Sequence, residues 1–161
     1  MRNSMNKKVD RAARILVLED DPSLREVLQE VLEARGLEVM GASHGEEALQ
    51  LARANPFDLI VADIRMKGIS GLDAIEQAQQ LQPGLASIVV SGYATEQETL
   101  RAVQLNVAGY LKKPFKIPKL LELVNKFLQQ RRSKIQTEEE IRNLRKSLLW
   151  SFSQQNHWAE K

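Results

Sequence analysis

The 161-residue chain contains no cysteine and no long apolar segment. The lack of cysteine excludes disulfides, thiolate metal sites and thiol redox chemistry. No apolar run approaches the roughly 18 residues that a membrane-spanning helix needs, and the N-terminus lacks the apolar core of a signal peptide. We therefore expect no membrane association, with the cytoplasm as the default location.

Length and charge narrow the class of protein further. One domain of ordinary size plus an extension fits into 161 residues, whereas a two-domain enzyme does not fit easily. The formal net charge is only +2, but basic residues crowd a start that has few large apolar residues. Residues 1–12 are therefore predicted to form a solvated, disordered basic tail.

Short apolar runs alternate with longer segments of helical periodicity. Strands are predicted at residues 15–18, 38–41, 59–62, 87–90 and 109–111, and helices at 24–34, 46–54, 72–81, 95–105 and 118–130. Five strands alternating with five helices imply an α/β fold, in which helices cover both faces of a doubly wound parallel sheet. Runs without polar alternation, such as Ile88-Val89-Val90, agree with strands that are buried on both faces.

Three acidic residues and one lysine follow the ends of these apolar runs. Asp20 and Asp21 follow the first run, Asp63 follows the third, and Lys113 comes shortly after the fifth. The carboxyl ends of parallel strands meet at one edge of a sheet, so we expect these four side chains to share a crevice. Carboxylates packed this closely repel one another unless a cation such as Mg²⁺ joins them. Helix capping is the alternative role for Asp20 and Asp21.

The sequence changes character near Ser133, where blocks of basic and acidic residues alternate. One helical stripe in this part carries four large apolar side chains, Ile141, Leu144, Leu148 and Phe152. We predict a domain at residues 13–132 and a helical extension at residues 133–161 that is partly disordered at its end. The stripe should be buried against the domain or against a second copy of the chain, as a homodimer through the C-terminal helices.

The residues at the strand ends resemble those of the receiver domain of two-component response regulators. The similarity covers about residues 13–130, and its segments occur in the order and spacing of that family. They are Glu19-Asp20-Asp21, Asp63-Ile64-Arg65-Met66 with Gly71, Ser91-Gly92, and Tyr110-Leu111-Lys112-Lys113-Pro114-Phe115. The resemblance implies a flavodoxin-like fold, with a five-stranded parallel sheet in the order 2-1-3-4-5.

The same resemblance assigns roles to the site residues. Asp63 is implied to be the phosphoacceptor, which takes a phosphoryl group from a phosphohistidine on a sensor histidine kinase or phosphotransfer protein. Lys113 is implied to contact a phosphoryl oxygen, with a cis peptide bond to Pro114. The implied ligands of Mg²⁺ or Mn²⁺ are Asp20, Asp21, Asp63 and the backbone carbonyl of Arg65.

Ser91 and Tyr110 resemble the switch pair of the family. Once Asp63 is phosphorylated, the Ser91 hydroxyl is expected to donate to the phosphoryl group and the Tyr110 ring to turn inward. The change would reach a downstream protein target through the surface of residues 95–105, 109–111 and 118–130. A serine at a strand end and a half-buried tyrosine are, by themselves, ordinary structural residues.

Some positions depart from the family pattern. Lys67 stands where proline is common. Arg65 lies two residues past the acceptor and could reach the phosphoryl group, so an altered dephosphorylation rate is a hypothesis. The residues after Gln130 are too few for a helix-turn-helix domain and mix acids with bases, so direct DNA binding is not expected. Residues 140–155 faintly resemble a kinase dimerisation helix, but Gln154 replaces the phosphodonor histidine.

Two other functions are weighed against a phosphoacceptor. A phosphatase of the haloacid dehalogenase type needs a second acid two residues after its nucleophile, where this chain has Arg65. A receiver-like interaction or dimerisation module that is not phosphorylated would be supported by loss of a site acid, and none is lost. We therefore expect no enzyme beyond self-catalysed phosphotransfer and slow hydrolysis of the aspartyl phosphate.

Overall fold

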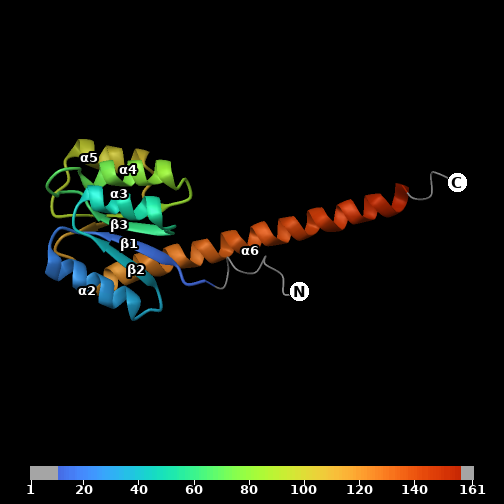
Figure 1. Ribbon diagram of the computed structural model, residues 1–161, viewed down its shortest axis with the longest axis horizontal. Coiled ribbons are helices and arrows are strands. Elements are labelled where there is room, and N and C mark those ends of the chain that lie inside the picture. The colour runs from blue at the N-terminus through green and yellow to red at the C-terminus, as the bar shows by residue number, and fades with distance from the viewer. Residues whose placement is uncertain (1–10, 157–161) are drawn as a thin grey trace. The chain divides into compact units, whose positions relative to one another are not determined.

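The computed structural model describes residues 11–156, and their side chains up to residue 154. Strands and helices alternate along this part of the chain (Figure 1). The elements are β1 (Arg14–Leu18), α2 (Pro22–Glu33), β2 (Glu38–Ala42), α3 (Gly45–Ala54), β3 (Leu59–Asp63), α4 (Gly71–Leu81), β4 (Ala86–Ser91), α5 (Glu96–Gln104), β5 (Gly109–Lys112) and α6 (Ile117–Asn156). Residues 1–10 of the predicted tail at residues 1–12, and residues 157–161 at the predicted disordered end, lie outside the described residues.

The five strands form one parallel sheet in the order β2-β1-β3-β4-β5. This order and the alternation of elements confirm the predicted flavodoxin-like fold. Leu18 at the end of β1 is paired with Ala42 of β2 and with Ala62 of β3. Ser91 at the end of β4 is paired with Lys112 of β5. The carboxyl ends of the five strands therefore lie at the same edge of the sheet.

Helices cover both faces of this sheet. Helices α3, α4 and α5 lie on one face and α2 on the other (Figure 1). The largest core cluster is built from alternate strand residues, among them Leu16, Ile60 and Val89, which pack with residues of α3 and α4. Successive side chains of a strand point to opposite faces, so the intervening strand residues face α2 and the first turns of α6. Both layers are apolar, as the uninterrupted apolar runs predict.

The starts of the helices follow from their capping residues. Asp21 caps α2 by accepting from the backbone N–H groups of Ser23 and Leu24, and Pro22 occupies the first turn, where no N–H is needed. Thr95 and Glu98 form a reciprocal capping box at the start of α5. These caps fix where α2 and α5 begin, and hence where the loops that follow β1 and β4 end.

The last helix is longer than the sequence predicts. Helix α6 runs from Ile117 to Asn156 without interruption, so the predicted boundary between residues 132 and 133 lies inside a continuous helix. The compact unit that contains the sheet comprises residues 12–125, and the part of α6 from Lys126 onward belongs to a second unit. Among the described residues, no helix is both long and apolar enough to cross a membrane.

Candidate phosphoacceptor site

Asp63 and Lys113 face each other at the carboxyl edge of the sheet. Asp63 is the last residue of β3 and is almost fully buried. The ammonium of Lys113, which follows β5, donates to Asp63 Oδ2 at 2.7 Å and to Glu19 Oε2 at 3.0 Å. The peptide bond between Lys113 and Pro114 is cis. The structure thus brings together the predicted acceptor and the predicted lysine, with Glu19 as a third member.

Three carboxylates form one acidic cluster here. Glu19, Asp20 and Asp63 each offer a carboxylate oxygen, and these oxygens lie within 4.8 Å of one another. Glu19 and Asp63 are buried, whereas Asp20 is exposed and keeps the cluster open to solvent. Hard carboxylate oxygens at this spacing are the donor set that Mg²⁺ or Mn²⁺ prefers, so the residues present fit the expected cation.

Asp21 has a different place from the one the sequence analysis assigned to it. Its Oδ1 accepts from the backbone N–H groups of Ser23 at 2.9 Å and Leu24 at 3.3 Å, so this carboxylate serves as the cap of α2. Its own backbone N–H donates to Glu19 Oε1 at 3.2 Å. The geometry therefore favours Glu19 over Asp21 as the third acid of a cation site. Capping, the alternative considered for both aspartates, applies to Asp21.

Glu19 could have been found from the predicted sheet itself. The first apolar run ends at Leu18, so the next side chain is the one that emerges at the edge of the sheet. Its position is level with Asp63, because Leu18 pairs with Ala62. The two aspartates that follow Glu19 have the same charge, but a shift of one residue at this point moves a side chain from the buried crevice to the start of α2.

The electrostatics of the site reflect its burial. Burial raises the pKa of Glu19 above its usual value and outweighs the hydrogen bonds from Lys113 and from the Asp21 backbone, which lower it. Burial on its own would lower the pKa of Lys113, but the hydrogen bonds to Asp63 and Glu19 outweigh it, so the pKa of Lys113 is raised. The lysine therefore stays positively charged against a surplus of carboxylates.

Ser91 and Tyr110 lie on neighbouring strands and on the same face of the sheet. Tyr110 is paired with Val89, and Ser91 is two residues further along β4. Ser91 is fully buried, and its hydroxyl has no hydrogen-bond partner. Tyr110 is 42% exposed, so its ring is turned toward solvent. A buried hydroxyl without a partner is costly, which makes Ser91 a polar group that a ligand oxygen would satisfy.

Arg65 contacts Asp63 through its backbone, whereas its side chain points away from the site. The backbone N–H donates to Asp63 Oδ1 at 3.1 Å. The guanidinium donates to the backbone carbonyl of Tyr93 at 3.0 Å and to Glu98 Oε2 at 3.3 Å, and lies 5.9 Å from the centre of the Tyr93 ring. The side chain thus joins the loop after β3 to the start of α5. The predicted metal contact of its backbone carbonyl stays a prediction.

Gly71 holds the loop after β3 against the acceptor. Its backbone N–H donates to the carbonyl of Ile64 at 3.0 Å. A Cβ atom at Gly71 would overlap the carbonyl group of Asp63, far inside van der Waals contact. Because the obstacle is backbone, no side-chain rotation would relieve the overlap. The start of α4 can therefore close on the end of β3 only with glycine at this position.

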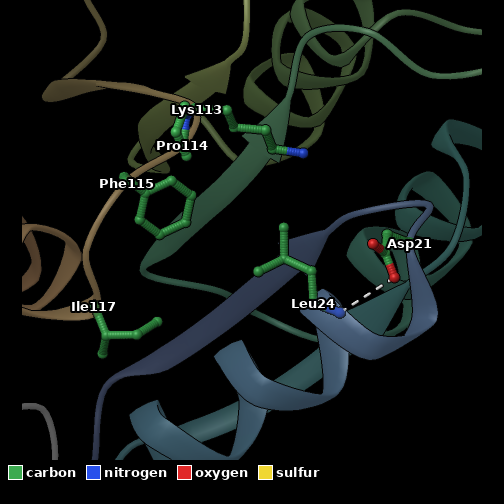
Figure 2. A pocket seen from close by; sticks show the side chains of 6 residues that line it. All are labelled: Asp21, Leu24, Lys113, Pro114, Phe115 and Ile117. Carbon is green, nitrogen blue, oxygen red and sulfur yellow. Dashed lines mark hydrogen bonds between the residues drawn. The ribbon is translucent and has the colours of Figure 1, made fainter.

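A pocket of about 450 Å³ opens beside Lys113. Figure 2 shows its lining, with Phe115 and Ile117 across from Leu24 and Asp21 at the start of α2, and Lys113 and Pro114 along one side. The lining is mostly apolar, but the lysine and the aspartate give it two charged groups. The pocket therefore offers an apolar surface directly beside the acceptor site.

A parallel sheet in the order 2-1-3-4-5, with acids and a lysine at its carboxyl edge, is the arrangement of a flavodoxin-like receiver fold. The profile of the response regulator receiver domain matches residues 15–125. The chain therefore belongs to the response regulator receiver domain family of two-component signal transduction, as its strand-end residues predict.

Individual relatives agree with this assignment. A response regulator receiver protein of Anaeromyxobacter is 32% identical over 110 residues, which are 68% of this chain and 46% of the relative. This chain thus spans less than half the length of that relative. A CheY-like receiver domain protein of Methanospirillum hungatei has a similar structure, with a TM-score of 0.74 and 28% identity over 77% of this chain and 99% of the other.

A third relative is a response regulator of Burkholderia pseudomallei, whose crystal structure has a phosphorylated aspartic acid, a calcium ion and citrate. It is 34% identical to this chain, with a TM-score of 0.65, and the match covers 81% of this chain and 75% of the other.

Proposed function

We propose that the chain accepts a phosphoryl group on Asp63. The observation that carries this proposal is the buried Asp63 carboxylate, 2.7 Å from the Lys113 ammonium and beside two further acids. An Asp63 oxygen attacks the phosphorus of a phosphohistidine. The new P–O bond forms as the P–N bond breaks, and the imidazole leaves after taking up a proton. Lys113 places its positive charge on the oxygens that gain charge in this transfer.

The acidic cluster would hold the cation that this chemistry needs. Glu19, Asp20 and Asp63 are the residues that would bind Mg²⁺ or Mn²⁺. When bound, the cation offsets the repulsion between the carboxylate nucleophile and the phosphoryl oxygens. The Burkholderia relative, with a phosphorylated aspartic acid and a calcium ion, supports a divalent cation in such a site.

Ser91 is the group that senses the phosphoryl oxygen. Its hydroxyl is buried without a partner, so a phosphoryl oxygen within its reach would gain a donor and relieve an unpaired polar group. Movement of Ser91 toward that oxygen would empty space beside Val89, into which the exposed Tyr110 ring can turn. The neighbouring surface of α5 carries exposed Leu100 and Val103, and we place the contact with a downstream protein there.

The pocket beside Lys113 is the proposed docking surface for the phosphodonor. A sensor histidine kinase or phosphotransfer protein must bring its phosphohistidine within bonding distance of Asp63. Apolar side chains of such a partner would be covered by Leu24, Phe115 and Ile117, which line the pocket. We expect no turnover enzyme, because Arg65 stands where a phosphatase would carry its second acid. The cytoplasmic location stays a prediction.

The test is the intact mass of the chain after incubation with Mg²⁺ and acetyl phosphate. We expect the gain of one phosphoryl group, and no gain without Mg²⁺ or in an Asp63→Asn variant. A second variant, Asp58→Asn, removes an aspartate that lies before β3 and should leave the gain intact. The absence of any gain with acetyl phosphate or with other small phosphodonors would instead favour the alternative, a receiver-like interaction module that is not phosphorylated.

A further inference from the structure

The second unit of the chain exposes an unusual amount of apolar surface. Six large apolar side chains of α6 beyond residue 140 are between 45% and 70% exposed: Ile141, Leu144, Leu148, Leu149, Trp150 and Phe152. A helix that is apolar over this much of its surface is normally covered by another element. No strand or further helix is described in this unit, so none of its described elements covers these side chains.

The spacing of these side chains defines a seam. Ile141, Leu144 and Leu148 follow one another at intervals of three and four residues, which places them along one side of the helix. This is the spacing of the two core positions of a coiled coil, with β-branched Ile141 at the first and Leu144 at the second. In parallel coiled coils this combination favours two helices over three or four. Phe152 flanks the seam, whereas Leu149 and Trp150 lie toward the outer side of the helix.

The charges next to the seam are complementary between two copies in a parallel orientation. In a parallel coiled coil, a residue on one flank meets the residue five positions later in the other helix. This rule pairs Glu140 with Arg145 of the partner subunit, twice in each dimer.

We propose that a second copy of this chain covers the seam in a parallel, in-register coiled coil. The partner is identified by the self-complementary charges and by the core spacing of the helix itself. The seam is about two heptads long, so its interface falls below the roughly 1,200 Å² of a typical stable complex. The dimer should therefore dissociate on dilution. Formation of this dimer does not require phosphorylation of Asp63, so an Asp63→Asn chain should dimerise with the same dissociation constant.

The orientation can be tested because the chain has no cysteine. Thr137→Cys, Leu144→Cys and Ser151→Cys each place one thiol at a core position of the seam, and each should form an interchain disulfide on oxidation of the full chain. Asn143→Cys, on the outer side, should not. An antiparallel pair can join only one of the three core positions, so cross-linking at a single position would overturn the proposal.

The charge pairing is tested by sedimentation of the full chain over a range of concentrations. Glu140→Arg and Arg145→Glu should each raise the dissociation constant about fivefold to tenfold, and the double exchange should restore it. Glu139→Arg, which lies on the outer side, is the matched control and should have little effect. A wild-type chain that stays monomeric throughout the range, or a double exchange that does not restore association, refutes the proposal.

Discussion

Neutralising Glu19 should weaken cation binding more than neutralising Asp21, although Asp21 was expected to be the ligand. Glu19 belongs to the cluster whose carboxylate oxygens lie within 4.8 Å of one another, whereas Asp21 caps α2. Two unit charges about 4 Å apart interact by about 1 kcal/mol in water, so a carboxylate at that distance from a divalent ion contributes about 2 kcal/mol. Glu19→Gln should therefore weaken Mg²⁺ binding by more than about tenfold.

Substitutions at Asp21 and at Glu19 should also differ in their effect on the free energy of unfolding. Asp21→Ala removes the cap of α2 and should lower the free energy of unfolding by about 1 kcal/mol, whereas Asp21→Asn keeps a capping side chain and should change it little. Glu19→Gln removes a carboxylate whose charge is disfavoured by burial, so the cation-free chain should lose little stability. Neither change at Asp21 should alter Mg²⁺ affinity by more than about threefold, because a more distant charge acts more weakly.

Calorimetric titration with Mg²⁺ measures the affinities, and urea denaturation without Mg²⁺ measures the stabilities. The reasoning is refuted if Asp21→Asn weakens Mg²⁺ binding as much as Glu19→Gln does. It is refuted equally by unchanged affinity in Glu19→Gln, because the carboxylate would then contribute nothing to the cation site. Thermal unfolding of each variant would exclude a general loss of structure as the cause.

Three further changes have expected outcomes. Arg65→Asn frees the Tyr93 loop and leaves room for water, so the aspartyl phosphate should hydrolyse several-fold faster, and an unchanged phosphate lifetime by intact mass would dismiss this role. Gln82→Leu removes three hydrogen bonds of 2.7–2.8 Å to backbone groups of residues 52–57 and should cost about 2 kcal/mol in urea denaturation. Arg101 lowers the pKa of Asp73, so the stability that this pair contributes is present above the usual carboxyl pKa and is lost as the pH falls through the lowered one. The difference between the chain and Arg101→Gln should stay below about 1 kcal/mol and vanish in acid, and a difference that persists there would contradict the ion pair.

The sheet could be predicted because its signals are local. Apolar runs of strand length, with helical periodicities between them, are enough to predict that strands and helices alternate and that the sheet is parallel. The carboxyl ends of parallel strands lie at one edge, which brings Asp63 and Lys113 together. The choice between Glu19 and Asp21 was harder, because it depends on where the chain leaves the sheet to within one residue. A helix cap and a buried ligand both call for an acid at this point.

The contacts of Arg65 and the length of α6 could not be predicted from the sequence, for two different reasons. The guanidinium of Arg65 reaches Glu98, a residue far along the chain, so its direction follows from tertiary packing. For α6, the change in composition near Ser133 suggested a boundary, but no proline or glycine follows Pro118 to break the helix. The amino-acid composition changes near Ser133, but no helix-breaking residue accompanies the change, so the helix continues.

Gly71 sets a limit on how this chain can vary. Any side chain at that position would displace the carbonyl group of the residue that bears the nucleophile, so the constraint acts through the backbone and cannot be relieved by a compensating side chain nearby. In a library that randomises position 71, only glycine should survive selection for phosphotransfer. A scaffold redesigned for another acceptor chemistry would have to keep this glycine while nearly everything on the outer face of α4 is free to change.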